Sequence, residues 1–369
     1  MTIMKTHSEL TLWQKKQASL LYYFSSMDYL KGLKFRLDAL MGITDDTLKK
    51  SREEKRDQWL RSPQWGDRNT TENWANNAWG FLADFRQSVT RDIADRALSI
   101  YHVTGTYQCG RGMSEYSMLW TTPEEQEKFD AAFAEISRYA GNIDDTMDKT
   151  GGSNEWTDFG LTLEWTKQRE HFPMLPKFRV WTDITAESGT LPPKTGVYVS
   201  VDDPHASLQF AWVGSPNGRL VDCTSFNDLG KTALAAVGRS RLWVDEKAML
   251  DFVFANLSNP ALSSDPFFKD PLVPKSVPSL VARNAFTSHP SQWCYVELLN
   301  GEFEPVEIET EHNSHEQHRF ASGTTCHDNG FYFTPAQVDS RRRFERGDVF
   351  PDLGSTYGKV IWQWDAKQN

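Results

Sequence analysis

The chain has 369 residues, more than a single hydrophobic core usually holds, so two or three domains are expected. Hydrophobic residues make up 39% of the sequence, charged residues 24% and aromatic residues 13%, which excludes a disordered chain. The net charge of −10 argues against a nucleic-acid-binding protein, because Lys and Arg supply most of that affinity. The same charge suits a basic protein partner, because complementary potentials raise the rate of encounter.

No targeting signal is evident in the sequence. Residues 1–16 lack the unbroken apolar segment of a signal peptide, and no run approaches the roughly 18 apolar residues of a membrane span. Four cysteines are scattered without CxxC spacing, which is typical of free thiols in a reducing compartment: Cys109, Cys223, Cys294 and Cys326. We therefore expect a cytoplasmic protein with no cofactor and no membrane partner.

Residues 1–155 are predicted to form an antiparallel helical bundle. The clearest helix follows Thr122, a suitable N-cap, with Pro123 at the first helical position and Glu125 completing a capping box. Its apolar residues recur at three- and four-residue steps: Phe129, Phe133, Ile136, Ala140, Ile143 and Met147. Further helices are expected over residues 9–40, after residues 44–47 and from residue 69 to residue 97, with an extended excursion over residues 101–120.

Residues 156–258 are predicted to form a first small β module with two helices. Strands are expected at residues 178–184, 195–201 and 207–214, and Asn217-Gly218 suits a tight hairpin turn. The two helices are expected at residues 226–237 and 245–257, and Asp245 is a suitable cap for the second.

Residues 259–280 contain five prolines and are predicted to be a semi-rigid connector: Pro260, Pro266, Pro271, Pro274 and Pro278. Residues 281–369 are predicted to form a second β module. Its expected strands are residues 293–299 and 302–308, joined by a turn at Asn300-Gly301, then residues 330–334 and 359–364. The fold class is therefore α+β, with a helical bundle followed by a mostly β half.

One phrase occurs twice in the chain. Residues 188–200 and 322–334 share Ser-Gly-Thr, then Gly and Tyr, at one constant spacing. Each copy leads from a loop into a strand, and each is followed by an aromatic strand, Phe210–Trp212 in the first case and Trp362–Trp364 in the second. This pattern predicts a duplicated β module, and chance similarity between glycine turns is the alternative.

No catalytic motif emerges from the sequence. Cys326 and His327 are adjacent in extended backbone, so their side chains point to opposite faces and cannot act as a nucleophile and its base. The spacing of His312, His315 and His318 could bind a metal, but the surrounding segment is polar throughout, and a solvated loop is favoured. The chain has no GxSxG, HExxH or P-loop motif, so we expect no enzyme activity.

Several polar and aromatic residues are candidates for contact with a partner. Trp and Arg are frequent at interface hot spots, and residues 65–79 are rich in both. Acidic residues at the carboxyl end of a helix oppose the helix dipole, so the carboxylates that follow residue 143 are candidates for a functional surface. The acidic pair that follows residue 201 is a weaker candidate, because a turn also explains it. The candidate set is Trp65, Asp67, Arg68, Trp79, Asp144, Asp145, Asp148, Asp202, Asp203, Arg342 and Tyr357, the last two from a basic insert in the second module.

Several longer phrases resemble a family of bacterial proteins. Residues 195–214, 218–253 and 330–365 are similar to immunity proteins of polymorphic toxin systems, the immunity protein 71 and immunity protein 72 family. The resemblance implies a cytoplasmic protein without enzyme activity that binds and sterically inhibits a cognate antibacterial toxin. Such toxins include ADP-ribosyltransferases and nucleases delivered by Rhs or type VI systems.

Two other functions remain open at this stage. A hydrolase could reverse the toxin's modification of its target, as an ADP-ribosyl-hydrolase does, and would use acidic residues such as Asp144, Asp145 and Asp148 to hold metal ions. A carbohydrate- or peptide-binding protein could use the exposed tryptophans.

Overall fold

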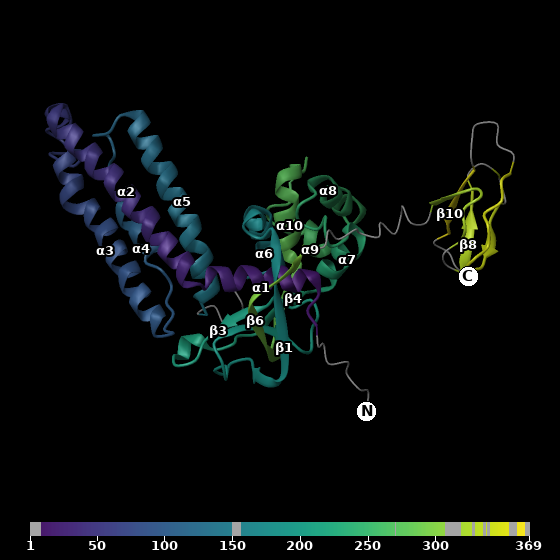
Figure 1. The fold of residues 1–369 in the computed structure, drawn as a ribbon. Helices are drawn as coiled ribbons and strands as arrows, with labels where there is room; N and C mark the ends of the chain where they lie inside the picture. The colour runs from purple at the N-terminus through teal and green to yellow at the C-terminus, as the bar shows by residue number, and fades with distance from the viewer. Residues whose placement is uncertain are drawn as a thin grey trace. The chain divides into compact units, whose positions relative to one another are not determined.

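The computed structural model describes residues 9–149, 156–269, 271–306, 319–326, 329–334, 337, 340–353 and 360–365. The chain divides into two compact units, Met1–Val306 and Glu307–Asn369, and each is described by itself. Helices dominate the amino-terminal part of the first unit and antiparallel strands follow, so the fold is α+β as predicted (Figure 1). No helix in the described ranges combines the length and apolarity needed to cross a membrane.

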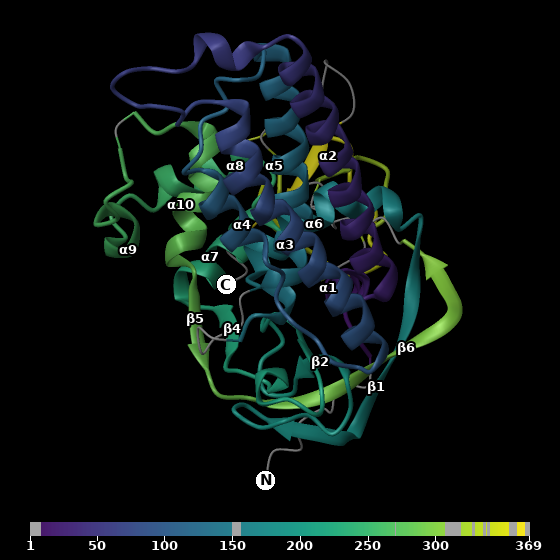
Figure 2. The same cartoon turned by 90° about the vertical axis from the view of Figure 1, so that its left-hand side faces the viewer.

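Three long helices lie side by side in both views and form the helical arm, residues 27–147 (Figures 1 and 2). They are α2 (Met27–Glu53), α3 (Thr71–Ala97) and α5 (Pro123–Met147), and the short α4 (Thr106–Met113) packs between α3 and α5. Neighbouring helices are antiparallel, because polar contacts step along them in opposite directions: Arg52–Glu72, Trp79–Asp45 and Arg86–Asp38. The core of the arm includes Leu33, Leu37, Trp74, Leu82, Phe129 and Ile136.

The clearest predicted helix is confirmed at its start. The Thr122 side chain accepts a hydrogen bond from the Glu125 backbone, the Glu125 carboxylate accepts from the Thr122 backbone, and Pro123 occupies the first helical position. These signals act within one turn, so they predict the boundary without knowledge of the rest of the fold.

The other helix predictions in this region need correction. The helix expected over residues 9–40 is two helices, α1 (Leu12–Phe24) and α2, because Ser26 caps the Tyr29 backbone and the chain turns there. No new helix starts after residue 44, since the Thr44 hydroxyl bonds to the Leu40 carbonyl inside a continuous α2. The expected excursion over residues 101–120 contains the helix α4.

A four-stranded antiparallel sheet lies below the arm in Figure 1. Its strands are β1 (Met174–Glu187), β6 (Gln292–Pro305), β2 (Gly196–Ser200) and β3 (Gln209–Ala211), in that spatial order. Helix α1 covers the sheet and bonds to it through polar side chains. The Tyr22 hydroxyl donates to the Val296 carbonyl, the Gln17 amide oxygen accepts from the Leu208 backbone just before β3, and Lys15 pairs with Glu304 on β6. One hydrophobic core therefore continues from the arm through α1 into the sheet.

A helical insert separates β3 from β6 in the sequence. It is flanked by the paired strands β4 (Cys223–Phe226) and β5 (Phe286–His289). Its helices are α7 (Asp228–Val237), α8 (Glu246–Ala255), α9 (Pro260–Ser263) and α10 (Val277–Asn284), with the 3-10 turn η4 (Pro274–Ser276) before α10. These helices share a hydrophobic core that includes Leu229, Trp243, Met249, Phe252 and Val281.

The insert also revises the role expected for the prolines in residues 259–280. Pro260, Pro274 and Pro278 lie in the first turns of α9, η4 and α10, where a missing backbone N–H leaves no intrahelical bond unmade. The segment that we expected to be a connector therefore contains short helices, and α10 is part of the core of the insert.

A buried carboxylate fastens the insert to the rest of the first unit. Asp158, at the first position of α6 (Asp158–Gln168), is 3% exposed and accepts hydrogen bonds from the indole N–H groups of Trp13 and Trp243, both at 2.7 Å. Arg239 donates to both Asp158 oxygens, at 2.8 and 2.7 Å, and its guanidinium lies 4.4 Å from the ring centroid of Trp13. The donors come from α1 and from the α7–α8 connection, so one side chain joins three parts of the chain.

The second unit has a four-stranded antiparallel sheet among its described residues. Its strands are β7 (Arg319–Ala321), β10 (Ile361–Trp364), β8 (Gly330–Phe333) and β9 (Arg342–Phe344), in that spatial order. Numbered within each module, both sheets have the order first, fourth, second, third, and every neighbouring pair is antiparallel.

The repeated phrase forms the same turn in both modules. Gly189 N donates to the Leu220 carbonyl and Leu220 N donates to the Thr190 carbonyl, at 2.8 and 3.0 Å. In the second copy Gly323 N bonds to Phe350 and Phe350 N bonds to Thr324, at 2.7 and 3.0 Å. The two glycines have φ angles of +84° and +88°, a conformation that favours glycine, so the repeated Ser-Gly-Thr has a physical cause.

The strand register extends this equivalence to the cores and corrects one predicted match. Tyr198 pairs with Tyr295 on β6, and the equivalent Tyr332 pairs with Trp364 on β10. Trp362 therefore corresponds to Trp293, and not to the expected Phe210–Trp212 strand. Matching positions in the two cores hold Tyr198 and Tyr332, Ala211 and Phe344, Leu220 and Phe350, Trp293 and Trp362.

Neither predicted Asn-Gly hairpin forms in the first unit. Asn217 and Gly218 lie in the 3-10 turn η3 (Pro216–Gly218), and the Gly218 carbonyl accepts from Trp212 N. At Asn300-Gly301 the strand β6 continues, and Gly301, at φ +77°, lies where β6 has extra residues opposite β1. Pairing with β1 on both sides of this irregularity keeps β6 in one direction.

Candidate functional site

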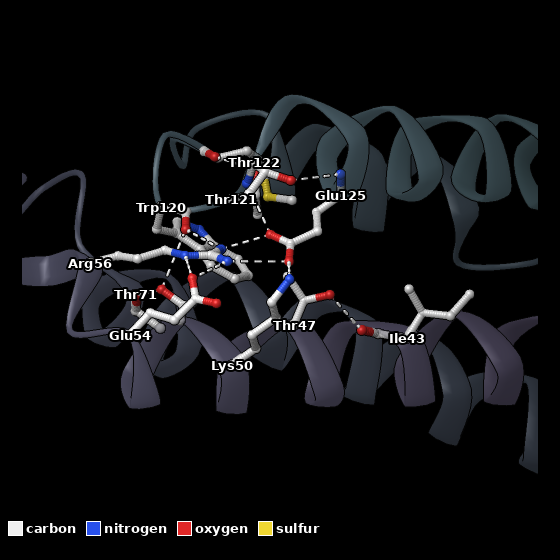
Figure 3. Close-up of polar contacts among 12 residues, drawn as sticks. Ile43, Thr47, Lys50, Glu54, Arg56, Thr71, Trp120, Thr121, Thr122 and Glu125 are labelled. Carbon is white, nitrogen blue, oxygen red and sulfur yellow. Dashed lines mark hydrogen bonds and ion pairs between the residues drawn. The ribbon is translucent and has the colours of Figure 1, made fainter.

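The far end of the helical arm carries an anchored loop. We call residues 54–70, which join α2 to α3, together with residues 117–122 of the α4–α5 connection, the arm tip. Arg56, in the 3-10 turn η1 (Arg56–Trp59), points toward Glu125 at the start of α5 (Figure 3). Its guanidinium donates to Glu125 at 2.6 Å, to Glu54 at 2.8 Å and to the Trp120 carbonyl at 3.1 Å.

Other hydrogen bonds fix the two helix ends that this loop connects. The buried hydroxyls of Ser51 and Thr71 lie 2.6 Å apart, and the Asp57 carboxylate accepts from the Thr71 backbone at 2.6 Å. Lys50 donates to Glu125 at 3.1 Å. The hydrogen bond from Arg56 is the main cause that lowers the pKa of Glu125 to about 2, so this carboxyl is ionised at neutral pH.

The anchored loop presents large apolar side chains to solvent. Trp59 is 84% exposed and Trp65 is 55% exposed, and Leu119 on the neighbouring connection is 65% exposed. Three of the predicted contact residues lie here: the Arg68 guanidinium is 5.8 Å from the ring centroid of Trp65, and Asp67 pairs with Arg61 at 3.2 Å. An anchored loop that carries exposed tryptophans is typical of a protein-binding surface.

Trp79 does not belong to the arm tip. It lies on α3, where its indole N–H donates to Asp45 on α2 at 2.9 Å. The half-buried side chain therefore fastens one arm helix to another, which gives it a packing role.

The acidic residues at the end of α5 separate into different roles. Asp144 is largely buried and accepts hydrogen bonds from the backbone and the hydroxyl of Thr104. Burial, followed by the charges of Asp145 and Asp148, raises the pKa of Asp144 to about 7 even though these hydrogen bonds favour its charged form. Asp144 thus positions the loop after α3, and its oxygens are already used. Asp148 ends α5 and lines a cavity.

That cavity lies at the base of the arm and has a volume of about 480 Å³. Its wall comes from the end of α3, the loop that follows it, the end of α5, and the segment after β3. The wall contains both acidic and basic side chains: Asp92, Asp95, Asp148, Arg91, Lys149 and Arg219. Asp92, Asp95 and His102 are the one group in the described ranges whose ligand atoms converge well enough to hold a metal ion, and the three carboxylates of α5 do not converge in this way.

The predicted pair Asp202 and Asp203 stabilises a turn. Asp202 accepts from the Gln292 backbone at 3.1 Å, and Asp203 accepts from the His205 backbone at 2.8 Å. Asp203 also lies 3.2 Å from His289 Nε2. Asp202 therefore ties the loop after β2 to the start of β6, and Asp203 ties the same loop to β5.

The Asp203–His289 pair places a third chemically active residue nearby. Cys223 Sγ lies 3.3 Å from His289 Nδ1 and 3.4 Å from Nε2, because Cys223 and His289 are cross-strand neighbours on β4 and β5. The ring nitrogens also contact Asp203 and the Pro290 carbonyl, at 3.2 and 3.0 Å. Cys223 is fully buried, and burial raises the pKa of its thiol to about 11, so the thiolate needed by a nucleophile is not formed at neutral pH.

The remaining predicted residues fall in the second unit. The Arg342 guanidinium lies 4.5 Å from the ring centroid of Trp362 and 5.4 Å from that of Phe344, so it covers two rings of the aromatic core. Tyr357, His312, His315, His318 and His327 lie outside the described residues. Cys326 is a buried free thiol, as are Cys109, Cys223 and Cys294.

Comparisons with models of protein families, with curated proteins and with solved structures found no match to this chain. The resemblance to immunity proteins therefore stays a prediction from the sequence phrases. Of the predicted contact residues, the structure brings together Trp65, Asp67 and Arg68. It adds Trp59 and Leu119 at the arm tip, and Asp92 and His102 at the cavity, which the sequence reasoning missed.

Proposed function

We propose that this protein is an immunity protein that binds a toxin domain in the cytoplasm and blocks it sterically, with the arm tip as the central contact. The observation that carries the proposal is the 84% exposure of Trp59 on a loop that the Arg56–Glu125 ion pair fastens to the start of α5. Exposing a tryptophan to water is unfavourable, whereas burying it in a partner's pocket can contribute several kcal/mol. Because the loop is already ordered, little conformational entropy is lost on binding.

The charge of the chain supports the same proposal. A net charge of −10 attracts a basic toxin domain, as nucleases commonly are because they bind phosphate. Protection of a cell requires a dissociation constant in the nanomolar range or below, which corresponds to about 12 kcal/mol. One or two tryptophan anchors can supply a third or more of this value, and the surrounding polar surface supplies complementarity.

The test uses the toxin encoded next to this chain. The purified proteins are expected to co-elute, and an equimolar amount is expected to abolish toxin activity. Trp59→Ala with Trp65→Ala should weaken binding at least 100-fold, since each hot-spot tryptophan contributes about 2 kcal/mol or more. Phe35→Ala is the matched control, because Phe35 is 74% exposed on α2 outside the arm tip and its loss should change affinity less than threefold.

Three results would contradict the proposal in different ways. Absence of co-elution with an active toxin rejects direct inhibition. Unchanged affinity of the double tryptophan variant rejects the arm tip as the contact and leaves inhibition standing. Protection of cells together with removal of the toxin's modification in a purified reaction would favour the hydrolase alternative.

A further inference from the structure

Three metal-binding side chains converge on the wall of the cavity at the base of the arm. Asp92 and Asp95 are three residues apart on α3, so they lie on one face of its last turns, and His102 follows in the loop. Their ligand atoms all lie within 4.8 Å of one another, and His102 Nε2 is 3.1 Å from Asp95 Oδ2. The ligand atoms of tetrahedral Zn²⁺ lie about 3.3 Å apart, and rotation of the exposed His102 ring can bring its nitrogen to that distance from the carboxylates.

The loop that carries His102 is held on both sides of the histidine. Before it, the Tyr101 ring packs against Phe210 and Trp212, with centroid distances of 5.1 and 5.6 Å. After it, Thr104 donates to the carboxylate of Asp144 through its backbone and its hydroxyl. The histidine backbone is therefore placed before any ligand arrives, which lowers the entropy cost of binding.

Two deeply buried polar atoms on the same wall lack a protein partner in the described ranges. Asp92 is 6% exposed, yet its Oδ2 accepts no hydrogen bond, and no cation of the described residues lies within ion-pair distance. The indole N–H of Trp212, which is 1% exposed, has no acceptor. Leaving such buried groups unsatisfied is unfavourable, and most of all for a charged group. A cation bound to Asp92 would satisfy the first, and a water or anion bound to that cation can accept from the second.

The placement of the acids also opposes the local helix field. Asp92 and Asp95 lie near the carboxyl end of α3, where the helix dipole disfavours negative charge. Nearby cations offset this only in part. Arg96 donates to the Ser25 carbonyl at 2.7 Å and its guanidinium lies 4.5 Å from the Tyr101 ring centroid, and Arg91 is exposed. Arg219, which also lines the cavity, donates to the carbonyls of Pro216 and Lys149, both at 3.4 Å.

We propose that Asp92, Asp95 and His102 form a site for one divalent transition-metal ion, with Zn²⁺ or Mn²⁺ as the fitting candidates. Two carboxylates and one imidazole suit these ions, whereas an all-oxygen shell would be expected for Ca²⁺ or Mg²⁺. Three protein ligands leave coordination positions open toward a cavity of about 480 Å³, so the ion would also bind water or an oxygen-containing ligand. This site is separate from the arm tip and does not depend on the proposed function.

The test measures metal binding by the full chain after chelator treatment and dialysis. Because His312, His315 and His318 could bind metal themselves, all variants carry His312→Ala, His315→Ala and His318→Ala. We expect one equivalent of Zn²⁺ by elemental analysis and a Co²⁺ visible spectrum typical of nitrogen and oxygen ligands. Asp92→Asn and His102→Ala should each weaken binding at least tenfold.

The matched control is Asp84→Asn, which makes the same charge change on an exposed position of α3 and should leave the affinity unchanged. Should Asp92→Asn fail to fold by circular dichroism, the exposed His102→Ala decides the question. No binding in the triple-alanine background, or an affinity unaltered by His102→Ala, would overturn the proposed site.

Discussion

Replacing Asp158 with alanine is expected to lower the stability of the first unit by about 4 kcal/mol. The substitution removes the shared acceptor of three side chains: the guanidinium of Arg239, which keeps only its bond to Thr162, and the indole N–H groups of the partly buried Trp13 and the buried Trp243. Removing one partner of a buried ion pair costs about 3–5 kcal/mol, and each neutral donor left unpaired costs about 1–3 kcal/mol. The Arg239 side chain is 21% exposed and can regain water, and the terms are not additive, so the total stays near 4 kcal/mol.

Urea unfolding followed by circular dichroism at 222 nm is the assay. The described residues of the second unit form strands, so the helical signal reports the first unit. With a slope of about 3 kcal/mol per molar urea, a loss of 4 kcal/mol moves the midpoint down by about 1.3 M. Asp158→Asn should move it less, because the amide oxygen can still accept one indole hydrogen bond.

The control is Asp130→Ala, which removes a carboxylate from an exposed position of α5 and should shift the midpoint by less than 0.3 M, about the effect of an ordinary surface substitution. A similarly small shift for Asp158→Ala would refute the reasoning that this network joins α1, α6 and the insert energetically. A double substitution of Asp158 and Arg239 that costs the sum of the single effects would refute their coupling.

Three further stability predictions concern the arm. Glu125→Gln should lower the free energy of unfolding by about 1–2 kcal/mol at pH 7. This value allows for the solvent that screens the exposed side of the Glu125–Arg56 ion pair. Because the pKa of Glu125 is lowered from near 4.5 to about 2, the stabilisation is complete above pH 4.5 and lost toward pH 2. The stabilities of parent and variant in urea titrations should therefore converge as the pH falls. A difference that stays constant with pH would count against the ion pair. Gly112→Ala should destabilise by at least 1 kcal/mol in thermal melts, because its Cβ would lie 2.5 Å from the Phe81 ring. Gly141→Ala, with open space around the new Cβ, should stabilise α5 by up to about 1 kcal/mol, and a loss there would contradict the open geometry.

Local signals allowed part of the fold to be predicted. The start of α5 follows from Thr122, Pro123 and Glu125, and Asp245 caps α8 as expected, since these hydrogen bonds form within one turn. The repeat was detectable because a left-handed backbone conformation needs glycine at residues 189 and 323. Both features depend on residues close together in the chain.

Features that depend on distant residues were missed. The sequence periodicity continues through Ser25 and Ser26, but the chain bends there because α1 packs on a sheet whose strands begin 150 or more residues later in the chain (174 − 24 = 150). The sequence predicts β6, the partner of β1, as part of the second module, because residues 221–290 separate it from β3. Asp92 and Asp95 could have been noticed as acids at a helix end, but their approach to His102 depends on how the following loop packs.

The two β modules differ mainly in what joins their third and fourth strands. In the second module, residues 351–359 connect Phe350 to the last strand. In the first module, the corresponding connection is residues 221–290, which contain helices with a hydrophobic core of their own. This sheet therefore accommodates an inserted helical domain at this connection. The helical insert could be removed, or another folded domain inserted in its place, without changing the pairing of the four strands.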